Sequence, residues 1–113
     1  MTDRKKLPTD RAGITTKIEV GPVTLYVTVN VDPAGNPLEM FCKADEGWQA
    51  WVDVLCETAS LALQHGCPFG TIMRHWRGNR FYPLGVPGQG TSIPDAIARR
   101  FWHEDEGVYR CSE

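Results

Sequence analysis

The chain has 113 residues, of which 42% are hydrophobic and 23% charged, and its formal net charge is −2. This length suits one domain of roughly 100–150 residues, and the composition excludes a disordered or fibrous protein. There is neither an apolar run near the ~20 residues of a membrane span nor a signal-peptide core, so we expect a cytoplasmic protein without a membrane partner. The slight acidity argues against polymeric nucleic acid as a partner.

The N-terminal third of the chain has the patterns of an arm followed by a hairpin. Residues 1–12 are polar and basic, and Pro8 interrupts them, so they are predicted to form a flexible basic arm. Apolar and polar residues then alternate over Ile14–Val20 and again over Val23–Val31. This period of two predicts two half-buried strands, joined at Gly21-Pro22.

The next segments predict a third strand and a long helix. Turn-forming residues occupy 32–37, and alternation returns over Leu38–Ala44. From about Gly47 the apolar residues recur at steps of three and four, which is the period of a helix. The helix is expected to end at Gly66, because Cys67-Pro68 follows and glycine favours a left-handed cap.

Two short helices and a tail are expected in the remainder. One helix is predicted over Pro68–Trp76, and residues 78–90 are too rich in glycine and proline for regular structure. Ser92-Ile93-Pro94-Asp95 is typical of a helix start with Ser92 as the cap, and residues 103–113 form an acidic C-terminal tail. The predicted fold is therefore α+β, with a small antiparallel sheet of about three strands packed against a central long helix and two short helices.

The central helix carries more apolar surface than one thin sheet needs. Trp48, Trp51, Val54 and Leu61 broaden its apolar stripe. Because a small domain covers such a surface poorly by itself, we expect a homo-oligomer.

Positive charge gathers in the C-terminal half of this acidic chain. Between positions 74 and 100 there are five arginines and a single acid, Asp95, so the local balance is +4. Guanidinium groups pair with phosphate oxygens, aromatic rings stack on bases, and a helix N-terminus suits an anion. The candidate ligand-binding residues are Arg74, Arg77, Asn79, Arg80, Phe81, Tyr82, Thr91, Ser92 and Arg99. The alternatives are a solvated helix face for the arginines and a simple capping role for Ser92.

No catalytic or metal centre is predicted. The four cysteines are unevenly spaced without a C-x-x-C pair, and no two histidines have ligand spacing. Paired carboxylates and an activated nucleophile are also missing from the pattern, so we expect neither enzyme activity nor a cofactor.

Three stretches resemble the TSCPD domain found at the C-terminus of B12-dependent ribonucleotide reductases. The first is Thr24–Asn30 followed by Asp32 and Gly35, the second is Ser60–Leu63 with Gly66 and Pro68, and the third is Ser92–Ala98. The similarity covers about Leu7 to Phe101, and residues 13–102 are assigned to a TSCPD-like domain. Ile93 stands where the family motif has cysteine, and Trp48 to Trp51 replaces a small-residue and cysteine entry to the helix. These departures weaken any metal or redox role.

Three binding functions are considered, of which the first two follow from the resemblance and the third from the basic cluster. Standalone phage proteins similar to this domain act as oligomeric sponges that sequester cyclic ADP-ribose-type signals, and some also hold cyclic oligonucleotides. This implies a small-molecule nucleotide ligand and an anti-defence role. The first alternative is an accessory nucleotide- or protein-binding module of ribonucleotide reduction. The second is an oligomeric interaction module whose basic cluster docks another protein.

Overall fold

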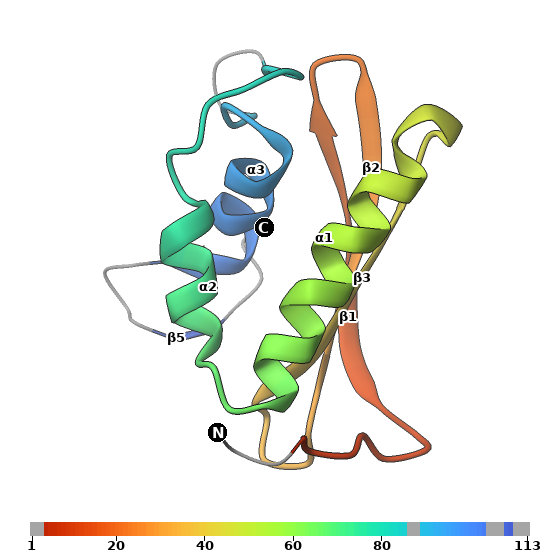
Figure 1. The fold of residues 1–113 in the computed structure, drawn as a ribbon, viewed down its shortest axis with the longest axis vertical. Helices are drawn as coiled ribbons and strands as arrows, with labels where there is room; N and C mark the ends of the chain where they lie inside the picture. The colour runs from red at the N-terminus through yellow and green to blue at the C-terminus, as the bar shows by residue number, and fades with distance from the viewer. Residues whose placement is uncertain (1–3, 86–88, 104–107, 110–113) are drawn as a thin grey trace.

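A three-stranded sheet and three helices make up the fold of the computed structural model, which describes residues 4–85, 89–103 and 108–109 (Figure 1). This arrangement confirms the predicted α+β class. In chain order the elements are β1 (Ala12–Val20), β2 (Val23–Val31), β3 (Pro37–Ala44), α1 (Glu46–Gln64), α2 (Phe69–Trp76), α3 (Ile93–Phe101), β4 (Trp102–His103) and β5 (Val108–Tyr109).

The sheet is antiparallel in the order β1-β2-β3, with one buried face and one exposed face. Val20 pairs with Val23 across the two-residue turn, and the register continues to Ala12 opposite Val31. Since side chains alternate along a strand, one face presents the apolar set to the helices and the other presents mostly polar residues to solvent. Phe41 is an exposed aromatic side chain on this polar face.

Helix α1 packs on β3 and covers its outer edge with polar side chains. The Ser60 hydroxyl accepts from the Met40 N–H at 2.8 Å and donates to the Met40 carbonyl at 2.9 Å. Gln49 accepts from the Ala44 N–H and donates to the Cys42 carbonyl, both at 2.8 Å. These bonds satisfy backbone groups that an edge strand otherwise leaves open.

The short helices α2 and α3 pack on each other and complete the core. Met73 of α2 and both Ile97 and Phe101 of α3 are fully buried. The predicted helix signals are confirmed, since the Ser92 hydroxyl accepts from the Asp95 N–H at 3.2 Å and Gly66 has a φ of 97°.

Some boundaries differ from the sequence predictions. Helix α1 begins at Glu46, one residue before the predicted start, and Pro68 caps α2 instead of belonging to it. After α3, β4 and β5 pair as a short ladder, which the sequence pattern does not predict. Much of the predicted acidic tail, residues 104–107 and 110–113, lies outside the described residues.

The described part of the predicted arm contacts the body of the domain. The Lys5 N–H donates to the Gln64 carbonyl at 2.7 Å, and the Arg4 Nε donates to the Gln64 side chain. Arg11 forms an ion pair with Glu39 at 2.7 Å. The flexibility of residues 1–12 stays a prediction.

Gly70 allows the close packing of α2 on Trp102. A Cβ atom at position 70 would lie 2.5 Å from the buried indole ring, whereas a Cβ at Gly47 in α1 would meet nothing within 4 Å. We predict that Gly70→Ala lowers the free energy of unfolding by about 1–3 kcal/mol, because the core is overpacked. Denaturant unfolding measures the effect.

The matched control is Gly47→Ala, which makes the same change in a helix with open space. It is expected to be neutral or to stabilise by up to about 1 kcal/mol, because alanine favours helix over glycine. Equal effects at the two positions would contradict the packing argument.

Candidate functional site

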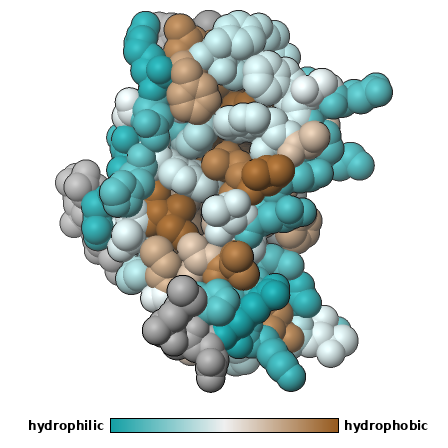
Figure 2. Space-filling view, viewed as in Figure 1, coloured by the Kyte–Doolittle hydropathy of each residue, from teal (hydrophilic) through white to brown (hydrophobic). Residues whose placement is uncertain are grey.

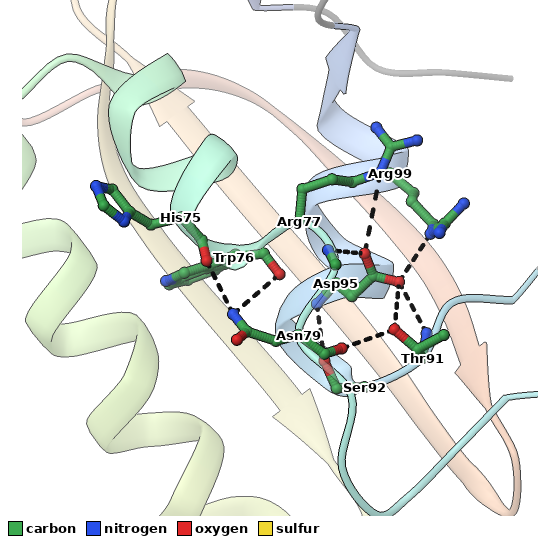
Figure 3. Close-up of polar contacts among 9 residues, drawn as sticks. His75, Trp76, Arg77, Asn79, Thr91, Ser92, Asp95 and Arg99 are labelled. Carbon is green, nitrogen blue, oxygen red and sulfur yellow. Dashed lines mark hydrogen bonds and ion pairs between the residues drawn. The ribbon is translucent and has the colours of Figure 1, made fainter.

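A buried carboxylate, that of Asp95, organises the region in which the candidate residues gather (Figure 3). Its Oδ1 accepts from the Gly78 N–H at 2.6 Å. Its Oδ2 accepts from the Thr91 N–H at 2.8 Å and from the Arg99 Nε at 2.7 Å. The side chain is completely shielded from solvent, so these donors replace the water that the charge would otherwise bind.

The environment keeps Asp95 ionised. Burial alone raises the pKa of a carboxyl, but the hydrogen bonds from Gly78, Arg99 and Thr91 and the charge of Arg99 outweigh it and hold the pKa of Asp95 below its ordinary value. Arg77 also approaches, with its Nε 3.9 Å from Oδ1. The carboxylate thus joins the segment after α2 to the start of α3.

Five of the predicted ligand residues lie in this network. Arg77 and Arg99 approach the carboxylate, and the Thr91 hydroxyl donates to the Asn79 carbonyl at 2.7 Å. The Asn79 amide donates to the carbonyls of His75 and Trp76 at the end of α2. Ser92 is fully buried and caps α3. The structure therefore shows structural roles for Asn79, Thr91 and Ser92, and their binding of a ligand stays a prediction.

The remaining predicted residues point to different neighbours. Arg80 is exposed in the loop after Asn79, whereas Arg74 lies with its guanidinium 5.7 Å from the centre of the Trp102 ring. Arg74 is therefore directed away from the Asp95 network, toward the β4 end of the domain.

The two loop aromatics contact tryptophans of α1. The Phe81 ring packs against Trp51 at 6.1 Å between centroids, and the Tyr82 ring lies 6.0 Å from Trp48. Tyr82 nevertheless remains 70% exposed. These contacts hold the first part of the loop against α1, and stacking on a base stays a prediction.

Sequence reasoning counted Asp95 only as the one acid among the arginines and missed its structural role. Two local signals were present, because Asp95 lies three residues after the cap Ser92 and four before Arg99. The bond from Gly78, 17 residues away in the chain, had no such signal.

The thiols of the core cysteines stay protonated at neutral pH and are therefore poor nucleophiles. Burial is the main reason that the pKa values of the Cys42 and Cys56 thiols rise to about 12. In the described part of the chain, no group of three or more histidine, cysteine or acidic residues is arranged to hold a metal ion. No described helix is long and apolar enough to cross a membrane.

Comparison with known proteins places the chain in a family. The model of the TSCPD domain matches residues 3–102. The chain therefore belongs to the TSCPD domain family, which confirms the resemblance predicted from its motifs.

The chain is similar to several proteins described as vitamin B12-dependent ribonucleotide reductases. It is 33% identical over 105 residues to those of Streptantibioticus cattleyicolor and Streptomyces coelicolor, which is 86% of this chain but only 18% and 11% of the relatives. The relative from Rhodopirellula baltica is 32% identical over 104 residues, with 85% and 10% covered. The chain thus spans less than a fifth of these relatives. No solved structure matches it significantly.

We predict that Asp95→Asn lowers the free energy of unfolding at pH 7 by about 3 kcal/mol, because Arg99 loses its buried charge partner. In the native chain the depressed pKa stabilises the fold above the unfolded value of about 4, and this contribution disappears as pH falls through the folded pKa. Denaturant unfolding at pH 7 and pH 3 measures both effects.

Asp10→Asn is the control, since Asp10 is exposed on the arm. It should leave stability within about 0.5 kcal/mol of the native chain. The stabilising role of the Asp95 charge is contradicted if Asp95→Asn is as harmless as Asp10→Asn. It is also contradicted if Asp95→Asn lowers stability as much at pH 3 as at pH 7.

Proposed function

We propose that this chain is an accessory binding module of ribonucleotide reduction that acts in the cytoplasm without catalysing a reaction itself. The observation that carries the proposal is the similarity of 86% of the chain to vitamin B12-dependent ribonucleotide reductases. Those proteins are far longer than the matched segment, so the proposal assigns to this chain a binding role and not the reduction.

An exposed cationic surface beside the Asp95 network supports a binding role. The side chains of Arg77 and Arg99 are 42% and 43% exposed, and Arg80 follows on the same loop. The buried carboxylate and its backbone bonds hold the segments that carry Arg77 and Arg99. Preorganised guanidinium groups suit phosphate or an acidic protein surface, because little conformational freedom is lost on binding.

We predict that the chain co-purifies with the B12-dependent ribonucleotide reductase of its source organism and that Arg77→Ala combined with Arg80→Ala weakens this binding about ten-fold or more. The melting temperature should change little, because Arg80 is exposed and the Arg77 Nε lies 3.9 Å from the Asp95 carboxylate, near the long limit of an ion pair. Affinity capture of the purified reductase, followed by titration, is the measurement. Lys43→Ala, which removes a charge from the exposed face of β3, is the control.

Sequestration of a cyclic nucleotide signal is the second candidate function. The excess of arginine over acid and the exposed Tyr82 ring favour it, since phosphate and base can be bound without chemistry. If the reductase does not bind while cyclic ADP-ribose is captured and then released unchanged on heating, the sponge function replaces the accessory one. A hydrolysed product would instead identify an enzyme.

We further propose that the chain forms a homo-oligomer through α1. Trp51, Val54 and Leu61 are exposed on this helix at steps of three and seven residues, and Val54 is 63% exposed. A groove of about 410 Å³ lies between α1 and α2, with Leu55, Ile72 and Trp76 among its lining residues. Figure 2 shows apolar side chains gathered through the middle of this face, with hydrophilic residues around them. An apolar patch of this kind favours association.

We predict that light scattering at micromolar concentration gives a mass of at least two chains and that Val54→Asp shifts it toward one chain. A carboxylate in the centre of an apolar contact is costly to desolvate, whereas the same residue exposed on a monomer is tolerated. Lys43→Ala, on the exposed sheet face away from α1, serves as the control. A native chain that is monomeric at this concentration would rule out the oligomer.

A further inference from the structure

Besides the apolar groove between α1 and α2, a polar groove lies between β1 and α3, at the edge of the sheet opposite α1. Its volume is about 390 Å³, which is within the range of small-molecule sites. Lys17, Ile18 and Glu19 form the β1 wall, and Ala96, Arg99 and Arg100 form the α3 wall. Of these residues, only Arg99 was among the candidates predicted from the sequence.

Among the residues that the structure describes, one cation at this groove has no counterion. Lys17 and Glu19 lie 3.6 Å apart, and Arg99 is paired with the buried Asp95. No described carboxylate lies within ion-pair distance of Arg100. The Lys17–Glu19 and Arg99–Asp95 pairs are each neutral, so the positive charge of Arg100 remains. The groove is therefore cationic and favours an anion.

Among the described residues, the guanidinium of Arg100 forms no ion pair with an acid. Its Nε is buried and has no hydrogen-bond partner among the described residues, although the residue as a whole is partly exposed. This Nε is closed to solvent, so a ligand in the groove can reach only the exposed part of the Arg100 side chain, which lines it. The positive charge of the side chain nevertheless attracts an anion to the groove.

The strand wall adds further donors. Strand β1 lies at the end of the sheet order, and alternate residues of an antiparallel edge strand direct their N–H groups away from the partner strand. On the other edge of the sheet, Ser60 and Gln49 of α1 take up such groups. The β1 edge borders the groove instead.

We propose that the groove between β1 and α3 is a binding site for a phosphate-bearing small molecule of about nucleotide size. Arg100 and Lys17 bind the phosphate oxygens, and Arg99 connects this site to the Asp95 network. The inference deepens the proposed binding function by naming a ligand class and a site, and it is independent of whether a reductase is the protein partner.

Isothermal titration of the purified chain with ADP at low salt tests the site. We expect one ADP to bind per chain. Inorganic pyrophosphate should compete with ADP if the diphosphate supplies the recognition. Arg100→Gln should weaken ADP binding about ten-fold or more, and added salt should weaken it further. Because Arg100→Gln alters a partly buried position, Lys17→Ala is the second variant, with an expected loss of about three-fold.

Lys43→Ala is the matched control for Lys17→Ala, because it removes the same charge from the other edge strand of the same exposed sheet face. The site is overturned if ADP does not bind at millimolar concentration, or if both groove variants bind it normally. Loss of ADP binding in the Arg77 and Arg80 double variant alone would place the ligand at the Asp95 surface instead. If the chain does not capture the reductase but still binds ADP, the accessory function is wrong, whereas the groove remains the ADP-binding site.

Discussion

The arrangement of the C-terminal half depends on the burial of one charge, the carboxylate of Asp95. A carboxylate without solvent is tolerated only where donors surround it, and here they come from Gly78, Thr91 and Arg99 (Figure 3). Gly78 and Thr91 lie at the two ends of the long loop and Arg99 lies in α3, so satisfying one side chain determines how the end of α2, the loop and α3 meet. The orientation of Arg99, and with it one wall of the β1 groove, follows from the same bonds.

Local patterns were sufficient to predict the elements of the fold. Strict alternation identified the hairpin of β1 and β2, and the change to helical spacing identified α1 to within two residues at either end. Ser92 and Gly66 were recognisable because caps depend on neighbouring backbone groups. The family could also be predicted, since its motifs are short and contiguous.

The candidate site was only partly predictable, because its contacts join residues that are distant in the chain. Charge counting found the arginines but could not show that Arg74 turns toward Trp102 or that Phe81 packs on Trp51. Lys17 is an ordinary exposed strand residue by its pattern, and only the packing of α3 beside β1 brings it near Arg100. Periodicity determines which face of an element is buried, but not which neighbouring element lies beside its edge.

The buried thiols of Cys42 and Cys56 lie where the sheet meets α1, and their raised pKa values leave almost no thiolate at neutral pH. A thiol reagent can therefore modify them only when this interface opens. The rate of modification then reports how often the helix separates from the sheet, and no cysteine has to be introduced for the measurement. The modification rate of these two buried cysteines therefore measures the opening of the core.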